Sequence, residues 1–507
     1  MKWFSRFLFS TLPLVAICTA QAAAPSIEQR ALHVLNRLGY GPKPGDVENV
    51  INMGIERYID AQLHPQTIPL PSALTQRLAA LEAANAPAGD VLADFLAAQK
   101  MAKQGDEDSK QKRRQVFQRI TEQTVEARLA RAVDSPRQLE EVMVDFWFNH
   151  FNVFAGKGMD RALVASYERD AIRPYALGRF RDLLGATAKH PAMLFYLDNW
   201  QSVAPGFQPR MPGRQIEGAK TRGLNENYAR ELMELHTLGV DGGYSQKDVT
   251  ELARMLTGWS FEPRDMIRGG GAFRFEPRRH DQGDKEWLGY HVVARGQGEG
   301  EWALDVLASH PATARHIGYQ LAQYFVADQP PSALVDRLAR RFLDTQGDIR
   351  AVLRTLFESA EFWEPAHMGN KFKTPYRYVV SALRASESEV VNVRPLAGAL
   401  SRLGMPLYEC QTPDGYKNTE ETWLNPDALT RRINFATALA SGRFPLDRPA
   451  DTDGQYGMGK RGTMVDAERL MSTLGSSLSM HTRDVAVNSQ PGLRAALLLG
   501  SPDFMRY

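Results

Sequence analysis

The chain has 507 residues, of which 43% are hydrophobic, so it is long enough to bury a large core. Its 61 basic and 59 acidic residues nearly cancel. This balance gives no support for nucleic acid or an anionic membrane as a partner, and we expect no nucleic-acid binding.

Residues 1–24 have the layout of a secretory signal peptide. Lys2 and Arg6 form a basic start, an apolar run extends from residue 7 to residue 20, and small residues then offer a cleavage site. The run is shorter than the ~20 apolar residues of a spanning helix, and Pro13 interrupts it. We therefore predict a periplasmic or secreted protein whose mature chain, residues 25–507, has no membrane span.

Removal of this segment changes both the charge and the cysteine count. Loss of Lys2 and Arg6 reduces the 61 basic residues to 59, which equals the 59 acidic ones, so the mature chain is formally neutral. Cys18 is removed and Cys410 remains alone, so no intrachain disulfide can form even in an oxidising compartment. We expect Cys410 to be a small buried hydrophobe.

Two helices are predicted between residues 27 and 63, separated by a break at residues 42–44. The second would begin with Asp46 as its N-terminal cap. From residue 69 to residue 114 the sequence is rich first in alanine and then in mixed charges. We expect this part to be an exposed connection between helices, because mixed charge is typical of a solvated segment.

Helical patterns resume at Gln115. Between residues 143 and 151 the apolar residues follow the i, i+3, i+4, i+7, i+8 spacing, which places His150 on the aromatic face of a helix. His150 is either a core histidine with hydrogen-bonded ring nitrogens or a ligand-binding residue. Farther along, Pro191 suits the first turn of a helix that ends near Asp198. Residues 201–222 then form a Pro/Gly-rich loop with a basic patch made of Arg210, Arg214, Lys220 and Arg222.

The stretch from residue 223 to residue 259 is the densest in polar groups. It predicts two helices joined by a glycine-rich turn, with Ser245 and Asp248 forming a capping box for the second. Glu231 and Glu234 project from one flank of the first helix together with Asn227, and His236 projects from the opposite flank.

Two interpretations of this stretch remain open. In one, Glu231 or Glu234 pairs with an arginine, Arg230 or Arg254, in a purely structural hairpin. In the other, the two glutamates are the catalytic acid and base, or ligands of a hard metal ion. The candidate ligand-binding residues are then Asn227, Arg230, His236 and Arg254.

A second candidate site lies in residues 260–300, a loop region rich in glycine and arginine with at most one short strand at residues 291–293. His280 and Asp281 are adjacent, and an adjacent pair of this kind can ligate a metal, or the carboxylate can orient the imidazole as a base. We take His280 and Asp281 as candidate catalytic residues and Lys285 as a ligand-binding one. If this loop met the 223–259 hairpin, the two would form one cleft.

The rest of the chain is dominated by further amphipathic helical patterns. Two of them have similar ends, TLFESAEF and ALLLGSPDF, in which a helix closes on a phenylalanine expected to be buried, Phe362 or Phe504. Sustained period-two alternation does not occur in the sequence. We therefore predict a mainly α fold: one large multi-helix domain with long Gly/Pro/Arg-rich loops and little β structure.

Several of these segments carry a family resemblance: HVLNRLGYGP, MVDFWFNHFNV, NENYARELMELHTLGVDGGYSQKDVTELARMLTGW, RRHDQGDKEWLG and LLLGSPDF. They resemble the bacterial family named domain of unknown function 1800, over nearly the whole mature chain. The resemblance implies an exported, mainly helical protein, often encoded beside an exported protein of the family named domain of unknown function 1501, which resembles sulfatases and alkaline phosphatases. It supplies no established catalytic residue. The family usually has a more acidic sequence where this chain has Arg377.

Two functional hypotheses follow. The first is an exported enzyme or enzyme subunit that acts on an anionic envelope or extracellular substrate, such as a glycan or a phosphate or sulfate ester, by acid–base or metal-assisted hydrolysis. A divalent metal ion is one cofactor that such a site can use. The second hypothesis is a non-catalytic scaffold or partner for the co-encoded exported protein, with arginine and tryptophan as anchoring residues.

Overall fold

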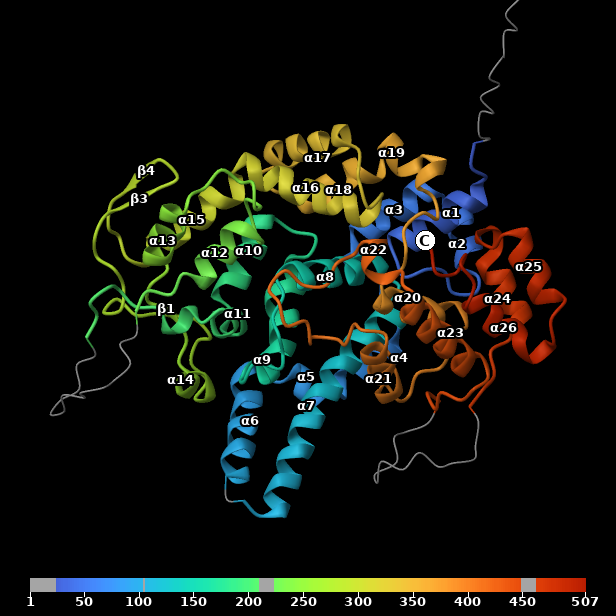
Figure 1. The fold of residues 1–507 in the computed structure, drawn as a ribbon, viewed down its shortest axis with the longest axis horizontal. Helices are drawn as coiled ribbons and strands as arrows, with labels where there is room; N and C mark the ends of the chain where they lie inside the picture. The colour runs from blue at the N-terminus through green and yellow to red at the C-terminus, as the bar shows by residue number, and fades with distance from the viewer. Residues whose placement is uncertain (1–23, 104, 209–222, 448–461) are drawn as a thin grey trace, which may run out of the picture.

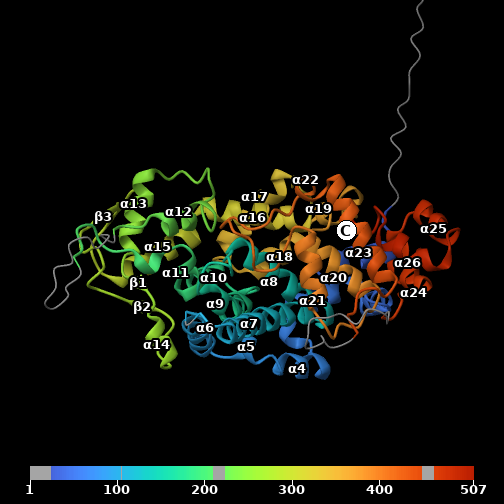
Figure 2. The same ribbon diagram turned by 60° about the horizontal axis from the view of Figure 1, so that its bottom comes forward.

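The structure is a computed structural model that describes residues 24–103, 105–208, 223–447 and 462–507. Helices account for most of the described residues, and the fold is a mainly α single domain, as predicted. Figure 2 shows α4 to α7 along one side of the molecule and α16 and α17 along the opposite side, with α8, α10 and α20 between them. No helix in these ranges is both long and apolar enough to cross a membrane.

The N-terminal part contains three helices: α1 (Ile27–Arg37), α2 (Asp46–Met53) and α3 (Ile55–Leu63). The single helix predicted from Asp46 is interrupted at Gly54, whose φ of 90° lies outside the helical range. The predicted cap is also wrong, because Gly45 occupies the cap position and the Asp46 carboxylate accepts a hydrogen bond from the Lys43 backbone instead.

The segment from residue 69 to residue 114 is helical, not the connection that its composition suggested. It contains α4 (Ser72–Ala79), α5 (Glu82–Asn85), α6 (Ala88–Ala102) and the start of α7 (Glu107–Asp134). The charged run forms the first turns of α7 because glutamate, lysine, glutamine and arginine are good helix formers. The Asp106 side chain caps it by accepting from the Ser109 backbone. In Figure 1, α6 and α7 project from the body as an antiparallel pair.

The centre of the chain forms α8 (Gln138–His150), α9 (Asp160–Ser166), α10 (Phe180–Lys189), α11 (Pro191–Tyr196), α12 (Asn227–Glu234) and α13 (Gln246–Met255). The predicted aromatic face of α8 is confirmed, since His150 and its apolar neighbours are buried. Pro191 does begin a short helix, and Ser245 and Asp248 do form a capping box. These three features are encoded by residues close together in sequence, which explains why the sequence predicted them.

Residues 259–300 contain the little β structure of the described chain. Strands β1 (Trp259–Ser260) and β2 (Arg274–Phe275) pair antiparallel, as do β3 (Lys285–Trp287) and β4 (Tyr290–Val292), and α14 (Pro263–Ile267) lies between the first two. The short strand expected at residues 291–293 is therefore present, shifted by one residue. Strand β3 packs on α13, and its Lys285 and Trp287 contact Glu299 and Trp302 of α15 (Gln297–Ser309).

The C-terminal half continues with α16 (Pro311–Phe325), α17 (Ser332–Asp344), α18 (Ile349–Phe357), α19 (Ala360–Trp363), α20 (Pro375–Ala385), α21 (Arg394–Arg402), α22 (Glu420–Trp423), α23 (Pro426–Ala440), α24 (Ala467–Leu474), α25 (Met480–Val487) and α26 (Pro491–Leu499). Phe362 and Phe504 are both buried, as predicted. In each case a serine three residues earlier, Ser359 or Ser501, accepts a hydrogen bond from the phenylalanine backbone. The two similar sequences, TLFESAEF and ALLLGSPDF, therefore form the same local hydrogen bond.

Candidate functional site

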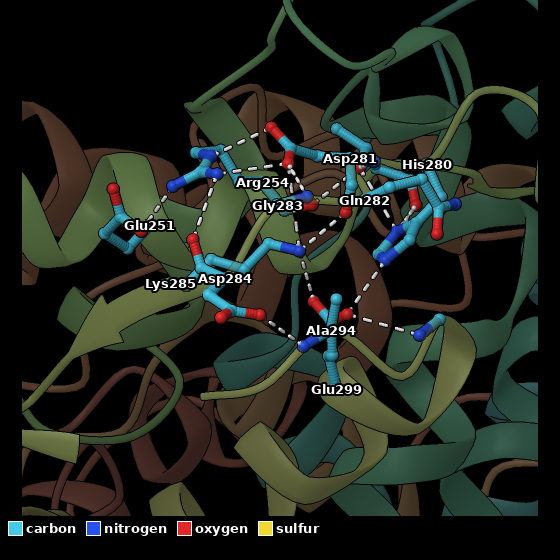
Figure 3. Close-up of polar contacts among 12 residues, drawn as sticks. Glu251, Arg254, His280, Asp281, Gln282, Gly283, Asp284, Lys285, Ala294 and Glu299 are labelled. Carbon is cyan, nitrogen blue, oxygen red and sulfur yellow. Dashed lines mark hydrogen bonds and ion pairs between the residues drawn. The ribbon is translucent and has the colours of Figure 1, made fainter. Parts of the chain in front are cut away.

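His280, Lys285 and Glu299 form a closed network at the start of α15 (Figure 3). His280 Nε2 lies 3.1 Å from one Glu299 oxygen and Lys285 Nζ lies 2.6 Å from the other, and none of the three side chains has exposed surface. Glu299 also accepts hydrogen bonds from the backbone of Arg295 and Gly296. Hydrogen bonds from His280 and Lys285 outweigh the effect of burial, so the pKa of Glu299 lies below its usual value.

Asp281 is held in the same network by an arginine of α13. Arg254 donates to both carboxylate oxygens, at 2.9 and 3.1 Å, and makes a third contact with Glu251 at 2.7 Å. The interpretation in which Glu231 or Glu234 forms an ion pair with Arg254 or Arg230 is therefore wrong, because Arg230 makes its direct contacts with Glu226 and Gln246. The His280 loop thus connects β3, α13 and α15, and its polar groups are occupied by internal partners.

A cavity of about 250 Å³ lies elsewhere, between α8, α12, α16, the start of α20 and a loop at residues 405–418. We call it the α8/α12 cavity. Its charged and aromatic lining includes the carboxylates Asp145, Glu234 and Asp414, the cations Arg377 and Lys417, the histidines His150 and His316, and the rings of Phe146, Tyr324, Tyr416 and Tyr507. Ligand pockets commonly measure about 300–1,000 Å³, so this cavity suits a small ligand or one unit of a larger one.

The two glutamates predicted from the 223–259 stretch are associated with this cavity. Glu234 lines it. Burial raises the pKa of Glu231, one helical turn earlier, and the neighbouring charges of Glu234 and Asp414 raise it further. Burial also raises the pKa of Asp414, but hydrogen bonds with Lys417 and Thr412 outweigh it and keep that pKa below its usual value. The environment therefore shifts the pKa values of Glu231 and Asp414 in opposite directions.

The third residue of that flank, Asn227, has a structural environment. Its side-chain nitrogen lies 3.5 Å from the Leu197 carbonyl, and its backbone nitrogen donates to the Asn225 side chain. Asn227 therefore helps to join the start of α12 to the end of α11. The α12 carboxylates and the His280–Asp281 pair have different neighbours, and the single cleft imagined from the sequence is divided into a cavity and a buried network.

Three histidines surround the end of α12. His150 donates from Nε2 to the His236 carbonyl at 3.1 Å, and His316 donates to the Leu235 carbonyl at 3.2 Å. Carbonyl groups at a helix C-terminus lack partners within the helix, and these imidazoles supply them. The His236 ring is itself buried against His150 and Phe151.

All three imidazoles are neutral at neutral pH. Burial, reinforced by the neighbouring His316, lowers the pKa of His150 to about 3. Burial also lowers the pKa of His316, and in His236 the nearby histidines add to the same effect. A neutral His150 with its proton on Nε2 fits the hydrogen bond to a carbonyl.

This cluster predicts loss of stability in acid. A histidine in the unfolded chain has a pKa of about 6.5 and binds a proton below that pH, whereas the folded His150 stays unprotonated. The free energy of unfolding therefore falls as the pH drops from about 6.5 toward 3. Replacing His150 by glutamine is expected to reduce the pH dependence of the unfolding free energy by up to about 1.4 kcal/mol per pH unit in that window. Urea unfolding at pH 7, 6, 5 and 4 measures it.

Exposed His481 gives the matched control for that experiment, because its side chain lies at the start of α25, on the surface. A His481→Gln chain should keep the wild-type pH dependence. If His150→Gln also kept it, proton uptake by a buried neutral His150 would be refuted.

The loop at residues 405–418 is fixed by two asparagines at the C-terminal end of α8, Asn149 in its last turn and Asn152 just beyond it. The Asn149 amide donates to the Tyr416 carbonyl at 2.8 Å and accepts from the Tyr416 backbone nitrogen at 2.7 Å. Asn152 donates to the carbonyls of Cys410 and Thr412. The sequence NHFN therefore fixes the loop through its asparagines and the end of α12 through its histidine.

Several lining residues were not identified from the sequence. His316, Gln320 and Tyr324 are spaced by four residues on α16 and lie on one helix face, a polar stripe that could have been noticed. Asp414 and Tyr416 lie in a loop without periodicity, so no local sequence pattern identified them as candidate site residues. Cys410 is buried, as predicted, close to Thr412.

Two further predictions concern a metal site and the basic patch. Among residues 24–103, 105–208, 223–447 and 462–507, no group of three or more His, Cys, Asp and Glu side chains is arranged to hold a metal ion. The basic patch of Arg210, Arg214, Lys220 and Arg222 lies outside the described residues, as do nearly all residues of the expected signal peptide.

Comparison with known families agrees with the resemblance noted in the sequence. The family model described as protein of unknown function (DUF1800) matches residues 33–506. The chain belongs to this family. The match includes α12, the NHFN segment and the 405–418 loop, so these three parts of the cavity lining lie within the family region. No curated protein and no solved structure was found to match the chain.

Proposed function

We propose that this DUF1800 protein is an exported hydrolase that uses Glu231, Glu234 and Asp414 beside the α8/α12 cavity for acid–base catalysis. The observation that carries the proposal is the meeting of Glu234 and Asp414, from distant parts of the chain, at one cavity, with Glu231 electrostatically coupled to both. Export is proposed from the signal-like layout of residues 1–24.

The roles follow from the different environments of the carboxyl groups. Paired carboxyls whose environments move their pKa values apart can serve as acid and base in one reaction. Glu231, with a raised pKa, is the proposed proton donor to the leaving group. Asp414, with a lowered pKa, is the proposed base that activates water. Glu234 lines the cavity and hydrogen-bonds with Tyr244.

Substitution of the two proposed proton-transfer residues tests this function. Glu231→Gln and Asp414→Asn should each lower kcat by about 10²–10⁴, the usual contribution of general acid–base catalysis. Turnover would be measured on a panel of p-nitrophenyl glycosides and esters, with thermal unfolding recorded for each variant. The control is Glu358→Gln, an exposed glutamate on the surface of the molecule, which should keep wild-type turnover.

The alternative function makes the opposite prediction. A non-catalytic scaffold or partner of a co-encoded exported protein would give no turnover above the uncatalysed rate on any substrate. It would instead co-purify with that protein whether or not Glu231 is replaced. Full activity in both Glu231→Gln and Asp414→Asn would also refute the catalytic roles.

A further inference from the structure

We infer that the α8/α12 cavity binds the carboxylate group of its ligand at Arg377. This residue takes no part in the proposed proton transfers, and the role rests on the proposed function only in that the bound ligand is then the substrate. Three features of the structure support it: the fixed position of Arg377, the positive charge around it, and the pairing of the other charged groups nearby.

Arg377 is a buried cation in the cavity wall, only 3% exposed. Its Nη1 donates to the backbone carbonyls of Asn36 and Gly39 at 2.7 and 2.6 Å. Its Nη2 donates to the Tyr324 hydroxyl at 3.3 Å, and its guanidinium carbon lies 4.3 Å from the centroid of the Tyr507 ring. These partners are neutral, so they fix the guanidinium without compensating its charge.

A second buried cation, Arg37, adds positive charge beside Arg377. Its guanidinium carbon lies 4.8 Å from the centroid of the same Tyr507 ring. Burial lowers the pKa of Arg37 to about 10, and repulsion by Arg377 contributes to the shift. Burial also lowers the pKa of Lys373, and the charge of Arg377 adds to that effect. Buried positive charge of this kind is costly, and an anionic ligand would stabilise it.

Two carboxylates near these cations are neutralised by other residues. Asp328 forms an ion pair with Lys371. Asp145 accepts from the Tyr324 hydroxyl at 3.4 Å and forms an ion pair with Arg128. Its buried network has equal numbers of arginines and carboxylates: Arg128, Arg131 and Arg173 with Asp145, Glu141 and Glu168. Neither Asp145 nor Asp328 is therefore the counter-ion of Arg377.

The remaining charged groups of the lining are Lys417, Asp414 and Glu234. Lys417 Nζ lies 2.7 Å from Asp414, so these two charges compensate each other. Glu234 hydrogen-bonds with Tyr244, a neutral partner. The lining histidines are neutral. Among the described lining residues, Arg377 is therefore the cation without an ion pair, and Glu234 is the carboxylate without one.

The free donors of Arg377 match a carboxylate. A guanidinium has five N–H groups, and Arg377 uses three of them for its protein partners. The N–H of Nε and one N–H of Nη2 remain, and a pair of guanidinium N–H groups can bind the two oxygens of a carboxylate. A phosphate ester carries about two negative charges at pH 7, and its second charge would share the cavity with unpaired Glu234. The ligand is therefore a small carboxylic acid, either a sugar acid or a peptide C-terminus.

Isothermal titration calorimetry on the wild-type protein tests this role with matched pairs of acid and amide. Glucuronate and glucuronamide represent a sugar acid, N-acetylalanine and N-acetylalaninamide represent a peptide C-terminus, and glucose 6-phosphate is the phosphate probe. In one pair the acid should bind at least about tenfold more tightly than its amide, because the amide lacks the charge that pairs with a buried guanidinium. The pair that shows this difference identifies the source of the carboxylate. Glucose 6-phosphate should bind more weakly than that acid.

Arg377→Met should abolish the difference between acid and amide, with folding checked by thermal unfolding. The matched control is Arg350→Met, because Arg350 also donates to a backbone carbonyl, that of Leu63 at 2.7 Å, but does not line the cavity. It should bind every probe as the wild type does. If Arg377→Met fails to fold, the comparison of acid and amide on the wild-type protein decides by itself.

Amides that bind as tightly as their acids in both pairs would overturn the inference. So would equal or tighter binding of glucose 6-phosphate, no binding by any probe, or an unchanged difference in folded Arg377→Met. Binding is measured without turnover, so the catalytic roles are tested separately. A preference for the acid together with full turnover in Glu231→Gln and Asp414→Asn would support the carboxylate site and refute those roles; no preference together with lost turnover would do the reverse.

Discussion

Replacing Glu299 by alanine is expected to lower the free energy of unfolding by about 3–5 kcal/mol, the usual loss when one member of a buried ion pair is removed. Lys285 would keep only its 3.9 Å contact with the Asp281 carboxylate and its hydrogen bond to the Asp281 carbonyl, in a site without exposed surface, and His280 would lose its partner at Nε2. The backbone groups that Glu299 accepts from at the start of α15 would also lose their partner. Urea unfolding followed by circular dichroism measures the loss.

Glu301 provides the matched control on the same helix. It pairs with Arg181 and Lys189, but its side chain is 28% exposed, so Glu301→Ala should cost about 1 kcal/mol or less. The double replacement Lys285→Met with Glu299→Leu should recover part of the lost stability, because an apolar pair leaves no unpaired buried charge. A loss below about 1 kcal/mol in Glu299→Ala would show that the network is not a stabilising one.

This experiment also separates the two candidate sites of the sequence. A catalytic His280 or Asp281 would predict loss of turnover with stability retained. The network predicts the reverse for Glu299→Ala: reduced stability, with turnover retained under conditions where the protein is folded.

Gly415→Ala is expected to displace the 405–418 loop and to reduce turnover about 100-fold, the order of loss that a misplacement of about 1 Å produces. Gly415 has a φ of 67°, where a side chain costs about 1–2 kcal/mol. A Cβ atom there would also lie 2.3 Å from the Asn149 carbonyl oxygen, which is too close for any contact. The loop would have to move, and Asp414 lies next to Gly415.

Gly45→Ala isolates the effect of backbone strain. Gly45 has a φ of 86°, but a Cβ atom there would meet nothing within 4 Å. Gly45→Ala should therefore lose about 1–2 kcal/mol of stability, the cost of a side chain at this φ, and keep full turnover. Asn149→Asp gives an intermediate case, since the carboxylate still accepts from the Tyr416 backbone but no longer donates to its carbonyl. Wild-type turnover in Gly415→Ala would refute the role of the loop in catalysis.

The sequence predicted local features well wherever the determining residues are neighbours along the chain. The aromatic face of α8 and the Ser245–Asp248 capping box are of this kind, because each is encoded within two or three helical turns. Errors arose where composition suggested a segment without regular structure. The charged run that begins α7 is polar on nearly all sides, so it has no apolar stripe to mark it as a helix, although its residues are good helix formers.

Only part of the candidate site could be identified from the sequence, for a different reason. Glu231 and Glu234 were identified because their spacing places them on one flank of α12. Their partner Asp414 lies far away in the chain, in a loop held by Asn149 and Asn152. The pairing of Arg254 with Asp281, not with the glutamates of α12, likewise depends on how α13 packs against the loop before β3.

The sequence by itself therefore determined the mainly α fold, the faces that pack inward, the family and two candidate groups of polar residues. Only the tertiary structure decided that His280, Lys285 and Glu299 form a closed network and that Glu234 and Asp414 border a cavity. The physical reason is the distance along the chain over which each feature is determined. Helical periodicity and capping are set by residues within about one to three turns, whereas the partner and the solvent exposure of a polar side chain are set by long-range packing between helices.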